Sequence, residues 1–170
     1  MQTNISTTDI TKYLGPNAKV MKYSELADYD DILEVLPSDK SYAIILIEES
    51  PNAGHWVCIM RYGDFIETFD SYGCHIDYEF KFINNCIRRL LGQTRHFLSE
   101  LLAKCDSKKI IYNKKRFQGS ESSTCGRHCI FRILMMKEFF YCLAEYQEFM
   151  KKRKDECGMT YDELICTFVK

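Results

Sequence analysis

The segment YAIILIEESPNAGHWVCIMRYGDFIETFDSYG, residues 42–73, decides the fold because it holds three extended stretches in close succession. Residues 42–48 are β-rich and too continuously apolar for a strand at the edge of a sheet. Residues 55–62 and 64–70 are two further extended runs, joined through Gly63, and this pattern predicts a β-hairpin. We therefore expect three strands to lie side by side in one sheet.

Helical patterns flank this segment. Residues 23–36 predict a short helix with a break, which Pro37 ends. Further along the chain, residues 78–91 and 95–105 repeat apolar side chains at helical spacing, and residues 109–113 predict a short fourth strand.

The last third of the chain is predicted to be helical. Residues 126–150 are apolar enough for one long helix that is buried on most sides, and a capping box from Thr160 to Glu163 opens a final helix. The order of these elements predicts a single α+β domain over residues 1–170, with a central mixed, mostly antiparallel β-sheet flanked by helices.

Composition supports one globular unit. Hydrophobic residues make up 46% of the 170 residues and Pro occurs three times, which excludes a disordered chain and a repeat array. The first 15 residues are polar, and no stretch approaches the roughly 20 apolar residues of a membrane span. We expect a soluble protein that does not associate with membranes.

The nine cysteines are scattered from Cys58 to Cys166, and none forms a C-x-x-C pair. An odd, scattered set argues against both a disulfide framework and a zinc ribbon. Most of these cysteines are expected to be small buried hydrophobic residues.

Charge is distributed unevenly along the chain. Residues 1–80 hold 5 Lys and Arg against 14 Asp and Glu, whereas residues 81–170 hold 18 against 10. The basic clusters of the second half fit either a solvated surface or weak contacts with nucleic-acid phosphates.

The segment FQGSESSTCGRHC, residues 117–129, carries the strongest sign of chemistry. Cys125 precedes the long helix, and a thiolate is favoured by the N–H groups and positive dipole of a helix start. Gly126 permits a substrate to approach closely, and Gln118 offers an amide that can help to bind an oxyanion. A zinc site using Cys125, His128 and Cys129 is the alternative, but its fourth ligand has no finger-like spacing.

Two residues of the hairpin complete a candidate site. His55 begins one strand and Asp70 ends the next, so a tight hairpin brings them together. The carboxylate would then orient the imidazole as a general base. Should Asp70 not fill this role, Asp64, Glu67 and Asp77 are the substitutes, with Glu67 first although its offset points it to the opposite face.

The order His, Asp, Gln, Cys resembles the cysteine proteases of the adenovirus maturation protease (adenain) type and the related proteases that process SUMO-like proteins. The resemblance implies that His55 is the general base, Asp70 the third triad member, Gln118 the oxyanion-hole side chain and Cys125 the nucleophile. It further implies that Trp56 walls a narrow tunnel that admits glycine-containing segments.

The resemblance also implies a papain-like or adenain-like fold whose long buried helix starts at the nucleophile, and a monomeric endopeptidase that needs no cofactor or metal. Its substrates would be viral capsid or precursor proteins, cleaved during virion maturation, in the virion or in the host cytoplasm or nucleus. An activating peptide and weak nucleic-acid binding are further partner hypotheses. The alternatives are an isopeptidase for ubiquitin-like proteins and a non-catalytic nucleic-acid-binding or protein-binding module.

Overall fold

A five-stranded mixed sheet forms the centre of the molecule in the computed structural model, which describes residues 4–170. Its strands are β1 (Val20–Lys22), β2 (Tyr42–Ser50), β3 (Ala53–Tyr62), β4 (Phe65–Phe69) and β5 (Lys109–Tyr112), and they lie in this order across the sheet. The long central pairings β2–β3 and β3–β4 are antiparallel, whereas the outer pairings β1–β2 and β4–β5 are parallel. The predicted α+β class, the hairpin at Gly63 and the fourth strand are confirmed.

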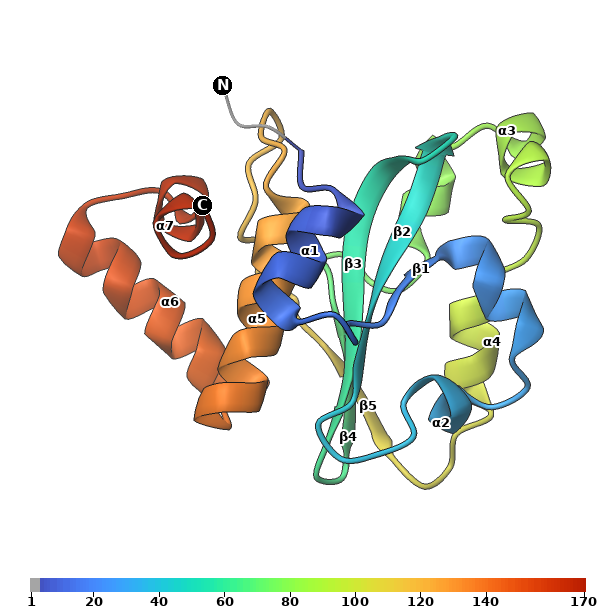
Figure 1. Cartoon of the computed structure of the whole chain (residues 1–170), viewed down its shortest axis with the longest axis horizontal. Coiled ribbons are helices and arrows are strands. Elements are labelled where there is room, and N and C mark those ends of the chain that lie inside the picture. Colours follow the sequence, from blue (N-terminus) through green and yellow to red (C-terminus); the bar gives the residue numbers. More distant parts are fainter. Residues whose placement is uncertain (1–3) are drawn as a thin grey trace.

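Helices cover both faces of this sheet (Figure 1). One face carries α1 (Thr7–Leu14), α5 (Cys125–Phe139), α6 (Leu143–Cys157) and α7 (Tyr161–Phe168). The other face carries η1 (Tyr23–Asp28), α2 (Ile32–Val35), η2 (Tyr78–Phe82), α3 (Asn85–Leu90) and α4 (Phe97–Ala103).

The two layers explain why β2 is apolar along nearly its whole length. Ile44 and Leu46 belong to the core under α1 and α5, while Ile45 and Ile47 belong to the core under η1, α2 and α4. Because successive side chains of a strand point to opposite faces, a strand buried on both faces shows no polar alternation.

Two helix predictions are wrong in their extent. Residues 78–91 form η2 and α3 rather than one helix, because Ile83 is extended and the Asn84 side chain caps a new helix at Cys86 N. Residues 126–150 form α5 and α6, because Phe140 adopts a left-handed conformation with φ 59° and ends α5. The break expected within residues 23–36 is present between η1 and α2.

Two short elements near the N-terminus were not predicted. Helix α1 begins after Ser6, whose side chain caps it in a capping box with Asp9. Strand β1 has only three residues and gains its place by parallel pairing with β2. The structure has, within residues 4–170, no helix long and apolar enough to cross a membrane.

A buried ion pair fastens α5 to the sheet. Arg132 donates from Nε and Nη2 to the two carboxylate oxygens of Glu67 at 2.9 and 2.6 Å, and both residues are fully buried. Tyr62 also donates to Glu67, at 2.6 Å. Such a fork holds the helix against β4 with fixed geometry, and this helix starts at Cys125.

Candidate active site

Cys125 is the first residue of α5 and is 8% exposed. Burial alone would raise the pKa of its thiol, but a hydrogen bond and the charge of the His55 ring outweigh it, together with backbone bonds at Trp56 and Gly126. The pKa of Cys125 therefore lies below its ordinary value. This is the environment of a reactive thiol rather than of an inert buried one.

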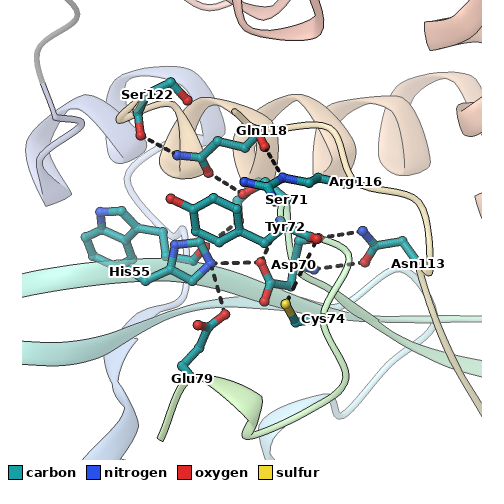
Figure 2. A network of polar contacts seen from close by, with 12 residues as sticks. His55, Asp70, Ser71, Tyr72, Cys74, Glu79, Asn113, Arg116, Gln118 and Ser122 are labelled. Carbon is teal, nitrogen blue, oxygen red and sulfur yellow. Dashed lines mark hydrogen bonds and ion pairs between the residues drawn. The ribbon is translucent and has the colours of Figure 1, made fainter. Parts of the chain in front are cut away.

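His55 lies on β3 opposite Ile47 of β2, and its Nε2 is 2.8 Å from Asp70 Oδ1. Asp70 follows the end of β4, and the same oxygen accepts the N–H of Tyr72 at 2.8 Å. The Asn113 side chain bonds to both the N–H and the carbonyl of Asp70, at 2.9 and 2.5 Å. Bonds to the carboxylate and to the backbone of Asp70 thus fix its position independently of the imidazole (Figure 2).

The imidazole of His55 stacks on the Tyr72 ring with centroids 4.8 Å apart. Burial lowers its pKa, but the hydrogen bonds with Asp70 and with Cys125 reverse this and raise the pKa well above its ordinary value. Because Nε2 is engaged by Asp70, Nδ1 is the nitrogen left for the sulfur. A raised imidazole pKa beside a lowered thiol pKa means that the pair favours the imidazolium and thiolate forms.

Glu79, in η2, is part of this site, although no sequence pattern singled it out. Its Oε1 lies 3.5 Å from His55 Nε2. Burial and the hydrogen bond with Asp70 raise the pKa of Glu79 to about 8, so at neutral pH it carries a proton that Asp70 accepts. Burial raises the pKa of Asp70, but the bonds from His55 and Glu79 bring it below its ordinary value. Figure 2 shows Glu79 and Asp70 approaching the same edge of the imidazole.

Two of the substitutes proposed for Asp70 are engaged elsewhere. Glu67 is paired with Arg132 in the core, and Asp77 accepts bonds from Tyr23 and Ser99. The expectation that Glu67 is the first substitute is therefore wrong, because its side chain points to the face of the sheet that α5 covers and is paired there with Arg132. The second carboxyl beside His55 is Glu79.

His55, Asp70 and Glu79 are also the group that comes closest to a metal-ligand set in residues 4–170, with ligand atoms within 4.8 Å of one another. The hydrogen bond with Asp70 contributes to the raised pKa of Glu79, while Glu79 Oε1 is buried without a hydrogen-bond partner. Cys125, His128 and Cys129, the zinc ligands weighed from the sequence, do not form such a group among the described residues.

Gln118 lies in the loop that precedes α5 and is 2% exposed. Its Oε1 accepts from Ser71 Oγ at 2.6 Å, and its Nε2 donates to the Ser122 carbonyl at 2.7 Å. An amide nitrogen has two hydrogens, so one remains for a ligand. Gln118, His55, Tyr72 and Cys125 together line a hollow of about 150 Å³.

A second hollow, of about 330 Å³, also has Cys125 in its lining. Met21, Leu46 and Trp56 form part of its apolar lining. Trp56 donates from Nε1 to the Ile5 carbonyl at 3.2 Å and is also part of the core, so it both anchors β3 and walls this hollow.

Gly126 is packed against the chain itself. A Cβ at this position would lie 2.9 Å from Ile5 Cβ and 3.2 Å from Trp56 Cδ1. Ile5 of the N-terminal segment thus makes the close approach to the backbone that this glycine permits, and Ile5 also lines the second hollow beside Cys125.

No family model matches the chain. A Sputnik virophage protein, described as "Uncharacterized protein V9", is 34% identical over 167 residues, which are 95% of this chain and 91% of that protein. The chain belongs to the V9 family. Among solved structures, this V9-family chain is similar to the ASFV pS273R protease, with a TM-score of 0.43 and 17% identity over 78% of the chain. The chain spans 57% of the length of that protease.

In this V9-family protein three of the four residues predicted to carry chemistry, His55, Gln118 and Cys125, line one hollow, and Asp70 reaches it through His55. His55 bonds to Asp70 and interacts with Cys125, and Gln118 lines the same hollow. Trp56 lines the second hollow, and Gly126 packs against Trp56 and Ile5, which both line it. Their chemical roles remain predictions.

Proposed function

We propose that this V9-family protein is a cysteine endopeptidase in which Cys125 is the nucleophile, His55 the general base and acid, and Asp70 the residue that orients the imidazole. The observation that carries this proposal is the buried thiol at the start of α5 with a lowered pKa, beside an imidazole that is held by a carboxylate at 2.8 Å. A binding module has no need of such a pair.

The geometry supports acyl transfer in two stages. The Cys125 thiolate attacks the carbonyl carbon of a peptide bond, and the oxyanion is stabilised by backbone N–H groups at the start of α5 and by the second N–H hydrogen of Gln118. The His55 imidazolium then gives its proton to the leaving amine. In the second stage His55 takes a proton from water, whose oxygen attacks the thioester carbon and breaks the C–S bond, which releases the carboxylic acid and restores the thiolate and imidazolium pair.

The site and the virophage relative support a proposal for the substrate class. Cys125 borders both hollows, so an extended chain can pass the sulfur from one hollow to the other. Trp56 lines the larger hollow, and its ring would favour glycine near the cleaved bond because glycine has no Cβ. With a virophage relative, we propose that the substrates are viral capsid or precursor proteins, cleaved during virion maturation at glycine-containing sites in the virion or host cell.

Iodoacetamide labelling across pH 5–9, followed by peptide mass spectrometry, tests the nucleophile. We expect Cys125 to react faster at acidic pH than the exposed Cys86 and Cys157, although it is the more buried thiol. His55→Ala should remove this advantage, while Cys157→Ala should leave it unchanged. Equal or slower labelling of Cys125 at every pH would contradict the proposed mechanism.

The substrate is tested by co-expressing viral structural proteins with the wild-type protein or with Cys125→Ala and comparing new N-termini. New termini that appear only with the wild-type protein, next to glycine, support the proposal. Release of a ubiquitin-like protein from conjugates, with no cut in structural proteins, would instead identify an isopeptidase.

A further inference from the structure

The loop between Gln118 and Cys125 is fastened by one carboxylate from the C-terminal helix. Asp162, in the first turn of α7, accepts the backbone N–H of Gly119 through Oδ2 at 2.8 Å. Its Oδ1 accepts from Ser122 Oγ at 2.9 Å and also from Thr124 Oγ1. Both ends of this short loop are thus bonded to a residue about 40 positions further along the chain.

Ser122 connects this carboxylate to the Gln118 side chain. While its hydroxyl donates to Asp162, its carbonyl accepts Gln118 Nε2 at 2.7 Å. On the other side, Ser71 Oγ donates to Gln118 Oε1 at 2.6 Å. Figure 2 shows the carboxamide between Ser71 and Ser122. Its orientation therefore depends on Ser71 beside Asp70 and, through Ser122, on Asp162.

The charge on Asp162 strengthens these bonds. Burial would raise the pKa of this carboxyl, but the nearby His128 ring and the bonds from Thr124, Gly119 and Ser122 lower it to about 2. His128 Nε2, from α5, is 3.6 Å from Oδ1, beyond an ordinary hydrogen bond. Hydrogen bonds to an ionised acceptor are roughly twice as strong as neutral ones.

Capping of α7 does not require Asp162. The N-cap is Thr160, whose hydroxyl accepts the N–H of Glu163 at 3.2 Å, while the Glu163 carboxylate accepts the N–H of Thr160 at 2.7 Å. Asp162 is thus free to bond outside its own helix, and three of its hydrogen-bond donors lie in the loop before Cys125.

We propose that Asp162 is a positioning residue for the reaction, which fixes Gln118 in the orientation that an oxyanion needs by holding Ser122 and Gly119. This inference rests on the proposed function, because it assumes that Gln118 is an oxyanion-hole donor. An oxyanion-hole donor is effective only if it is fixed before the reaction begins. The C-terminal helix is accordingly part of the catalytic architecture, although it lines neither hollow beside Cys125.

Two probes of Cys125 separate this role from a general effect on the thiol. Acylation by p-nitrophenyl acetate passes through a tetrahedral oxyanion, whereas alkylation by iodoacetamide does not. The rates of both reactions at Cys125 are measured by mass spectrometry for the wild-type protein, Asp162→Asn and Gln118→Ala. Glu163→Gln, on the same helix, is the matched control.

Gln118→Ala should slow acylation by on the order of 10²-fold, and Asp162→Asn by about tenfold or more, while alkylation changes less than about twofold. The Asn side chain would either point an N–H donor at the loop or offer the loop one acceptor oxygen fewer than the carboxylate does. The effects of Asp162→Asn and Gln118→Ala should be non-additive in the double variant, since both act on one donor. Glu163→Gln should leave both rates unchanged.

Equal acylation by the wild-type protein and Asp162→Asn would overturn the inference, and so would an equal loss of both reactions in a folded variant. If Asp162→Asn does not fold, Ser122→Ala keeps the carboxylate and removes one of its bonds, and it must lower the ratio of acylation to alkylation. Failure of the proposed function looks different. In that case the wild-type Cys125 is neither acylated nor alkylated ahead of the exposed thiols, and the inference falls with it.

Discussion

Gly54→Ala is expected to lower the reactivity of Cys125 by displacing strand β3, which carries His55. Gly54 pairs with Glu48 beside an irregularity in the β2–β3 ladder, and His55 follows it. A Cβ at position 54 would lie 2.0 Å from the Ile47 carbonyl oxygen and 2.9 Å from Glu48 Cα. These are backbone atoms, so no side-chain rotation relieves the contact.

The displacement follows from these distances. A Cβ atom essentially never lies within 3.0 Å of a non-bonded heavy atom. To relieve the contact with the Ile47 carbonyl oxygen, β3 must move away from β2 by about 1 Å, and His55 moves with it. A shift of that size would lengthen the 2.8 Å contact between His55 and Asp70 beyond hydrogen-bond range. Misplacement of a catalytic group by about 1 Å can reduce activity on the order of 10²-fold.

The assay is the pH dependence of Cys125 alkylation, followed by mass spectrometry, with circular dichroism to confirm folding. Gly54→Ala should move the rise in alkylation rate to higher pH, because the imidazole no longer stabilises the thiolate. Asn52→Gly in the same turn is the control. Asn52 has φ 60°, which glycine adopts readily, and its backbone N–H to Glu48 Oε1 is retained. A folded Gly54→Ala protein with the wild-type profile would refute this reasoning.

Four further outcomes are expected. On a cleaved protein substrate, Gln118→Ala should lower kcat by on the order of 10²-fold with little change in KM; an effect on KM alone would contradict an oxyanion role. The free energy of unfolding of the wild-type protein, relative to Glu79→Gln, should fall as pH rises from about 4.5 to 8. The reason is that the unfolded carboxyl ionises near 4.5, while the folded one keeps its proton until a pKa of about 8; a pH-independent difference in urea titrations would count against this. Arg132→Met should lower the free energy of unfolding by about 3–5 kcal/mol, because it leaves the buried Glu67 charge unpaired, and a loss below about 1 kcal/mol in urea would disprove it. If the basic residues of the second half contact phosphates, anisotropy of a labelled DNA duplex should show binding that weakens with salt; no binding at low salt would remove nucleic acid from the partners.

Local sequence patterns were sufficient for the centre of the sheet and for the starts of α5 and α7. The run from Tyr42 to Glu48 is apolar on both faces, and Gly63 lies in the turn of the hairpin. The pairing of these strands could therefore be predicted from strands that are neighbours in the sequence. The capping box at Thr160 likewise depends on residues three positions apart. The hairpin was enough to predict that His55 and Asp70 meet, whereas the resemblance carried by the order His55, Asp70, Gln118 and Cys125 implied that the other two residues join them.

Contacts between distant segments decided the rest. Phe140 ends α5 in a left-handed conformation that a phenylalanine rarely adopts, so no local signal marks the break between α5 and α6. Glu79 reaches His55 from η2, and Asp162 reaches Ser122 across 40 residues. Such carboxyl groups are recognisable only when folding buries them, because burial sets both their pKa values and their partners. The sequence alone determined which residues could react, and the tertiary structure decided which charges and hydrogen bonds surround them.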